Sequence, residues 1–124
     1  MIIDGHVHDF SLKIIANVTK REEMAKLLCL ETKQAKERIS IANLIKRMRV
    51  CNINSALLLP TAPAKIVSEV NLQFIETAKQ HNSLFTAATL HPELNDIKKE
   101  LERLSDNNVK AIKLCSFSQG FKLY

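Results

Sequence analysis

Two histidines one residue apart, His6 and His8, end the apolar run that opens the chain. Side chains at positions i and i+2 of a strand point to the same face of a sheet, so these imidazoles are expected to lie side by side. Neutral imidazole nitrogens bind Zn²⁺ and similar divalent ions. The pattern therefore predicts two ligands of a metal site, with zinc as the expected ion. The alternative is a histidine pair that binds no metal.

Asp4 has the same even spacing and is expected on the face of the two histidines. A carboxylate there could accept a hydrogen bond from an imidazole N–H and fix its tautomer, as the partners of metal-bound histidines usually do. The alternative is a structural aspartate whose carboxylate is satisfied by backbone donors. The sequence leaves both interpretations open.

Short apolar runs predict four strands, and helical spacing of apolar residues predicts the segments between them. In the helix expected at residues 94–105, the charged side chains Lys98, Lys99, Glu100 and Glu102 are expected to point outward. The strands are expected at 2–8, 55–59, 84–90 and 109–115, and the helices at about 21–30, 35–50, 64–80 and 94–105.

This alternation predicts an α/β fold with a parallel sheet and right-handed crossovers. An open doubly wound sheet and a (β/α) barrel both fit the order of elements. No glycine-rich turn follows the first strand, which disfavours a dinucleotide-binding fold. A metal pair at the carboxyl end of a strand favours the barrel, because barrel active sites lie on that face.

The segment at about residues 9–34 is long for a connection between a strand and a helix. We interpret it as a helical insertion within one unit that spans residues 1–124. Its place after the first strand would suit a lid over a site at the strand ends. The simpler alternative is an insertion with no role in chemistry.

Composition argues against several classes of function. The net charge of +5 comes from 18 basic and 13 acidic residues that are scattered along the chain, and only 5% of residues are aromatic, with no Trp. We therefore expect no nucleic-acid partner. No apolar run is long enough to span a membrane, and no signal peptide precedes the first strand. Three cysteines without a C-x-x-C pair indicate reduced thiols and a cytoplasmic protein.

Four segments together resemble one family. Ile3-Asp-Gly-His-Val-His8 resembles the Asp-x-His-x-His signature that opens the amidohydrolase superfamily of metal-dependent hydrolases. The later segments resemble successive strand ends of its amidohydrolase-related branch. They are Leu57-Leu-Leu-Pro60 with Asn71, Ala87-Ala-Thr-Leu-His-Pro-Glu93, and Lys110-Ala-Ile-Lys-Leu114 followed by Gln119-Gly-Phe121.

The resemblance implies a (β/α)₈ barrel in which a metal-activated water attacks an amide, ester or lactone, although some members decarboxylate a small-molecule substrate instead. A complete barrel needs about 250 residues. We therefore expect residues 1–124 to be a partial barrel of about four β/α units, the N-terminal part of a hydrolase and inactive alone. Later strands would supply further histidine ligands and an aspartate. The alternative is a non-catalytic half-barrel that self-associates as a homo-oligomer. A phosphoesterase with a similar opening fits the later segments less well.

The resemblance also suggests roles for residues at the later strand ends. In a subset of the superfamily, a lysine at the position of Lys113 is carboxylated and bridges two metal ions. Lys113 is therefore a candidate catalytic or substrate-contacting residue, and the alternative is a lysine that reaches solvent. Cys115 stands where the family pattern has a histidine, which leaves the role of that histidine in doubt. The remaining candidates for substrate contact are His91, Gln119 and Phe121.

Overall fold

The computed structural model describes residues 1–8, 26 and 40–122. The chain divides into two compact units, residues 1–8 with 54–124 and residues 9–53, which we describe separately. The predicted insertion and the helix at about 21–30 lie outside the described residues, apart from Lys26, which is helical.

The described part of the second unit is the helix α4 (Ile41–Val50) and its two ends. Ser40 begins the helix, and its hydroxyl accepts a hydrogen bond from the Asn43 N–H at 3.2 Å. This is a typical N-cap, because the first N–H groups of a helix have no partner within it. Asn52, at the end of the helix, has a left-handed backbone conformation (φ 55°). Asparagine adopts this conformation more readily than most residues. The structure thus describes a helix over part of the predicted 35–50 segment.

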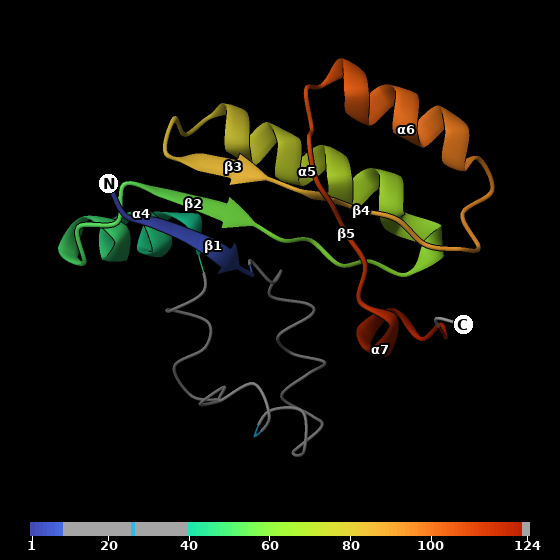
Figure 1. Cartoon of the computed structure of the whole chain (residues 1–124), viewed down its shortest axis with the longest axis horizontal. Helices are drawn as coiled ribbons and strands as arrows, with labels where there is room; N and C mark the ends of the chain where they lie inside the picture. Colours follow the sequence, from blue (N-terminus) through green and yellow to red (C-terminus); the bar gives the residue numbers. More distant parts are fainter. Residues whose placement is uncertain (9–25, 27–39, 123–124) are drawn as a thin grey trace. The chain divides into compact units, whose positions relative to one another are not determined.

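Parallel strands form the frame of the first unit. The strands β1 (Ile3–Val7), β2 (Ser55–Leu58) and β3 (Leu84–Thr86) lie side by side in chain order. One residue later, β4 (Ala88–Thr89) continues the path of β3 and pairs in parallel with β5 (Ile112–Lys113). Figure 1 shows β3 leading directly into β4. Strands that are neighbours in the sequence are therefore neighbours in space.

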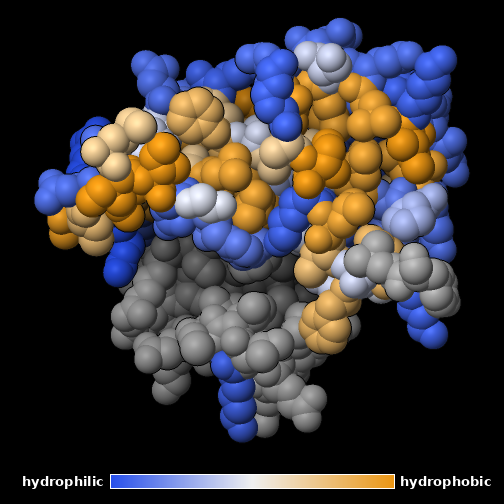
Figure 2. All heavy atoms as spheres, viewed as in Figure 1, coloured by the Kyte–Doolittle hydropathy of each residue, from blue (hydrophilic) through white to orange (hydrophobic). Residues whose placement is uncertain are grey.

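The two faces of the three-stranded sheet differ in burial. Ala56 and its strand partner Leu84 are buried on the face that the helices cover. Leu57 pairs with Phe85 on the opposite face, and Phe85 is 56% exposed. Ile3 pairs with Ser55, which lies two residues before Leu57, so Ile3 is on the same face as Leu57. Ile3 is 57% exposed. We call the surface formed by Ile3, Leu57 and Phe85 the open face; Figure 2 shows hydrophobic side chains gathered over β2 and β3.

Helices cover the other face. The single 3-10 turn η1 (Ala64–Ile66) leads into α5 (Val67–Lys79), and α6 (Ile97–Asp106) packs beyond it (Figure 1). The helix α6 begins at Asp96, whose carboxylate accepts a hydrogen bond from the Lys99 N–H at 2.9 Å. The apolar side chains of both helices meet the strands in one cluster. Its members are Ile75, Ala88 and Leu104, with Leu90 and Val109 packed against them.

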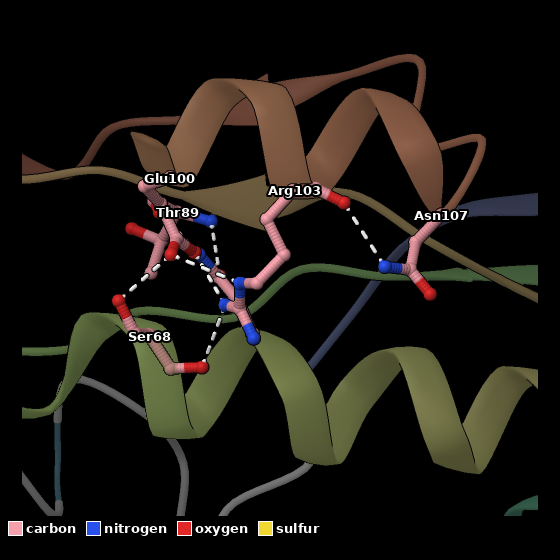
Figure 3. A network of polar contacts seen from close by, with 6 residues as sticks. Ser68, Thr89, Glu100, Arg103 and Asn107 are labelled. Atoms are coloured by element: carbon pink, nitrogen blue, oxygen red, sulfur yellow. Dashed lines mark hydrogen bonds and ion pairs between the residues drawn. The ribbon is translucent and has the colours of Figure 1, made fainter. Parts of the chain in front are cut away.

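The outward position predicted for Glu100 is wrong, because its side chain is buried between α6 and α5 and only 4% exposed. Its carboxylate accepts hydrogen bonds from Asn71 Nδ2 and the Ser68 hydroxyl, both at 2.7 Å. Arg103 donates to both carboxylate oxygens, at 2.6 and 3.1 Å (Figure 3). Helical periodicity places Glu100 beside the apolar stripe, and these partners, from α5 and from α6 itself, make its burial tolerable.

Asn71 joins this network to the sheet. The Thr89 N–H donates to Asn71 Oδ1 at 2.8 Å, and Asn71 Nδ2 donates to the Thr89 carbonyl at 2.9 Å. One side-chain amide thus satisfies both backbone groups of a fully buried strand residue. Asn71 is itself only 1% exposed. This contact fixes α5 against the carboxyl end of β4, where the candidate site begins.

The ionisation of Glu100 depends on its partners. Burial opposes the charged form, but hydrogen bonds from Arg103, Asn71 and Ser68, together with the Arg103 charge, outweigh it and lower the pKa of Glu100 from 4.5. A group with a depressed folded-state pKa stabilises the fold above its unfolded pKa, and that stabilisation is lost as the pH falls through the folded pKa.

The parallel α/β class predicted from the sequence is confirmed, whereas a barrel stays a prediction, because the described residues form two open sheets. Several boundaries differ. The predicted strand at 84–90 is interrupted at Ala87, and the one at 109–115 is reduced to β5. The short helix α7 (Ser116–Gln119) was not predicted. Within the described part of the chain, no helix has the length and apolar character needed to cross a membrane.

We predict that Asn71→Ala lowers the free energy of unfolding by about 2–4 kcal/mol, because it leaves both Thr89 backbone groups buried without a partner. Urea unfolding followed by circular dichroism measures this. Gln73→Ala on the same helix is the matched control, since the Gln73 side chain makes an exposed contact with Glu69 at 3.5 Å. The control should change stability by less than about 0.5 kcal/mol. Equal losses in both variants would contradict the role given to Asn71.

We predict that Glu100→Gln flattens the acid limb of the stability curve. In the parent chain, the contribution of Glu100 is complete above its unfolded pKa near 4.5 and disappears as the pH falls below it. The variant lacks this ionisation, so it should be less stable than the parent at pH 7, and the difference should shrink in acid. Thermal melts over a pH series test this. Glu102→Gln, at an exposed position of α6, should follow the parent curve.

Candidate metal centre

The two histidines at the end of β1 converge. His6 Nε2 and His8 Nε2 lie 3.0 Å apart, and their rings meet edge to face with centroids 4.8 Å apart at an interplanar angle of 75°. The sequence prediction that these side chains lie side by side is therefore confirmed. Their nearest atoms are the ring nitrogens best placed to coordinate a shared ion.

The expected face of Asp4 is different, because the strand pairing changes register within β1. Asp4 pairs with Ala56 and Val7 pairs with Leu58, so an extra residue lies between the two pairs. Asp4 and Val7 consequently share a face, and the even spacing no longer places Asp4 beside the histidines. Its carboxylate accepts a hydrogen bond from the His6 backbone N–H at 3.1 Å. This contact matches the structural alternative; the supporting role for Asp4 behind a metal ligand stays a prediction.

A contact across the sheet fixes the tautomer of His8. His8 Nδ1 lies 3.0 Å from the Leu59 carbonyl oxygen, which can only accept, so Nδ1 carries the proton. In the neutral ring Nε2 then bears the lone pair, and Nε2 is the atom that faces His6. A backbone carbonyl bound to the other ring nitrogen is a common support for a metal-ligating histidine. In the metal-free ring pair, the His6 Nε2–H donates to this lone pair.

The protonation of His8 favours the same role. Burial and then the nearby Lys113 charge lower the pKa of His8 from 6.5, and His6 adds to this, while the hydrogen bond to Leu59 opposes it. Neutral imidazole is the form that binds metal, so His8 is poised as a ligand at neutral pH.

Lys113 is the third nitrogen group at this position. β5 pairs with β4 through Lys113 and Thr89, and this pairing brings the half-buried Lys113 toward β1. Its Nζ lies 3.5 Å from His8 Nε2, although 105 residues separate the two in sequence. The sequence placed both residues at strand ends, and the structure brings them together. Whether Lys113 takes part in catalysis stays a prediction.

The donor set fits part of a metal site. Ligand bonds of about 2.0–2.1 Å to two nitrogens 3.0 Å apart give an angle of about 95° at the ion, which a divalent ion accepts. A catalytic zinc ion usually has three protein ligands and one open position. Among the residues that the structure describes, no group of three or more His, Cys, Asp or Glu side chains could hold an ion. The described residues therefore supply at most two ligands, fewer than a catalytic zinc ion usually has.

His91 and Phe121, predicted to contact substrate, lie in a structural cluster. His91 is 5% exposed; its Nδ1 accepts from the Glu93 N–H at 3.2 Å, and its Nε2 donates to the Gln119 carbonyl at 3.1 Å. Its ring meets the edge of Phe121 with centroids 5.2 Å apart. Both ring nitrogens are engaged within the chain, so substrate contact by His91 would require another arrangement and stays a prediction.

Gln119 fastens the unpredicted helix α7 to the segments that follow β2 and β4. Its amide nitrogen donates to the carbonyls of Ala62 and Leu90, at 2.9 and 2.8 Å, and lies 3.2 Å from the Thr89 hydroxyl. Its amide oxygen accepts from the Cys115 N–H at 2.8 Å. The left-handed Gly120 (φ 78°) ends the helix. The glycine in Ser-Phe-Ser-Gln-Gly is a sequence signal for a helix end. A helix this short has no apolar periodicity, so the sequence alone did not predict it.

Cys115 follows Lys113 at the same strand end. Hydrogen bonds from Ser118, first from its hydroxyl and then from its backbone, lower the pKa of the Cys115 thiol, against the effect of burial and with help from the Lys113 charge. A lowered pKa alone does not make a nucleophile, and no described base contacts the thiol. We assign Cys115 no role in the candidate site.

A groove in the described residues opens elsewhere. It encloses about 320 Å³ between β3 and residues 109–111, and it is lined mainly by apolar side chains with Lys79 and Lys110. None of the predicted site residues lines it. The chemistry of the side chains, rather than the depth of a cavity, therefore identifies the candidate site.

A comparison with models of known families and a search of curated proteins found no match for this chain.

We predict that the chain binds Co²⁺ or Zn²⁺ through both histidines, and that His6→Ala and His8→Ala each weaken binding more than roughly tenfold. The visible spectrum of Co²⁺ measures affinity directly. His81→Ala removes a histidine just beyond the end of α5 and is the control. Binding that survives both site substitutions, or that falls equally in the control, would exclude the pair as ligands.

Proposed function

We propose that this chain is part of a metal-dependent hydrolase of the amidohydrolase type, in which His6 and His8 hold a divalent ion, zinc being the expected one. The observation that carries the proposal is the hydrogen bond from His8 Nδ1 to the Leu59 carbonyl at 3.0 Å, which leaves the lone pair of Nε2 directed at His6. This is the tautomer in which Nε2 can ligate an ion. The resemblance of four segments in order is the independent support.

The order of the strands supports the barrel that this proposal requires. β1, β2 and β3 are parallel and adjacent in chain order, and β4 and β5 continue that order. A barrel is built in this way, whereas a doubly wound sheet reverses its order at a switch point. We infer that the described strands are the first four of a (β/α)₈ barrel, with β3 and β4 as two halves of its third strand. The histidines then lie at the carboxyl ends of the strands, where barrel enzymes have their active sites.

A bound zinc ion supplies a water that ionises near neutral pH and polarises a substrate carbonyl. The residues of this chain hold the ion and set its surroundings. Burial and the nearby Lys113 charge favour the neutral form of His8, the Leu59 carbonyl holds it in the Nε2-ligating tautomer, and Lys113 places a cation beside the ligands. A third ligand and a general base would come from outside the described residues. By resemblance, the substrate is an amide, ester, lactone or a carboxylate that loses CO₂.

The expected compartment is the cytoplasm. Cys51 and Cys115 are both free thiols, and Cys51 is exposed. An exposed free thiol suits a reducing compartment, where a disulfide framework is not used.

A second candidate function rests on the open face. A parallel sheet is normally covered on both sides, yet Ile3 and Phe85 are each more than half exposed. A non-catalytic module that self-associates through this face would also bury it. In that case the histidine pair would have no catalytic part, and association would not depend on metal.

We predict that the protein produced from the full reading frame hydrolyses a lactone, ester or amide in a panel only when loaded with metal. Chelation should abolish turnover, Zn²⁺ should restore it, and His8→Ala should lower kcat/KM at least 100-fold, while His81→Ala should not change it. Metal-independent turnover, or full activity of His8→Ala, would refute the proposal. Metal binding without turnover, together with metal-independent oligomers in light scattering, would favour the self-associating module.

A further inference from the structure

Among the described residues, the candidate site carries a cation without a matching anion. Lys113 Nζ is 3.5 Å from His8 Nε2, and no carboxylate among the described residues forms an ion pair with it. By contrast, the buried carboxylate of Glu100 has an arginine partner at 2.6 Å. A half-buried ammonium group beside two imidazoles is expected to attract an anion from solution, because nothing in the described chain neutralises it.

The acidic side chain of β1, Asp4, forms no ion pair with Lys113. Asp4 shares its face with Val7, opposite the histidines, and its Oδ1 accepts a hydrogen bond from the His6 backbone N–H at 3.1 Å. A divalent ion on the histidines would add two more positive charges within reach of Lys113. The site would therefore be strongly cationic and would favour a ligand that brings negative charge.

We propose that Lys113 binds the carboxylate of the substrate, so that the natural substrate is a small organic acid rather than a neutral ester or amide. This inference rests on the proposed function for the position of the metal ion. A carboxylate has two oxygens, and one can contact the Lys113 ammonium while the group remains beside the ion. Lys113 is then a substrate-binding residue, and its charge, rather than its basicity, is what the site uses.

The test uses the whole chain loaded with Co²⁺ and three probe anions: acetate, bicarbonate and chloride. Acetate should change the visible Co²⁺ spectrum in a saturable way, and Lys113→Gln should weaken acetate binding roughly tenfold or more while Co²⁺ affinity is retained. Lys113→Arg keeps the charge and should restore most of the binding. Lys110→Gln is the matched control, because it removes the same charge three residues away, where the side chain lines the separate groove.

Each outcome decides a separate question. Acetate binding that is equal in Lys113→Gln and Lys110→Gln overturns the inference and leaves the metal site intact. Chloride binding as tight as acetate binding overturns it too, because the site would then sense charge alone. Bicarbonate binding without acetate binding overturns the assignment to an organic acid.

A failure of the proposed function gives a different result: Co²⁺ would not bind, or His6→Ala would not weaken it. Lys113 would then be tested in the metal-free chain, where acetate should shift the NMR signal of the Lys113 side chain but not that of Lys110. The absence of a selective shift there overturns the inference independently of the metal.

Discussion

The first unit depends on how one strand residue, Thr89, is held. Its backbone N–H and carbonyl are both bound by the Asn71 side chain, and its hydroxyl lies 3.2 Å from the Gln119 amide. Its strand partner is Lys113, which reaches His8. The packing of α5, the attachment of α7 and the position of the cation at the site therefore share one fully buried residue. A change in the register of β4 would move all three together.

The sequence predicted the frame of this arrangement but not its details. Apolar runs and helical periods are local signals, so the parallel strands and the helices α5 and α6 could be predicted, and the i, i+2 spacing correctly brought His6 beside His8. The extra residue in β1 could not be predicted, since a change of register depends on the partner strand. The even spacing therefore gave the wrong face for Asp4, because the extra residue lies between Asp4 and the histidine side of the strand.

Other details escaped prediction because they depend on backbone atoms or on distant partners. The Leu59 carbonyl fixes the tautomer of His8, and a contact with a backbone atom cannot be read from residue types. The burial of Glu100 depends on Ser68 and Asn71, about 30 residues earlier in the chain. A helical wheel drawn for α6 alone places a charged residue outside, and only the facing helix reveals that the carboxylate has enough donors to be buried.

Glu100 and Lys113 are two charged residues of this unit with different surroundings. The Glu100 carboxylate accepts hydrogen bonds from Ser68, Asn71 and Arg103, and these bonds join α5 to α6. We therefore assign its charge a structural role and not a ligand-binding one. Lys113 is half-buried at a strand end, and among the described residues its Nζ lies 3.5 Å from the imidazole of His8 with no carboxylate paired to it. Burying an ammonium group without an anion costs stability, and a structural lysine could avoid that cost by reaching solvent. The position of Lys113 is thus poorly explained by folding alone and better explained by a ligand that completes its charge.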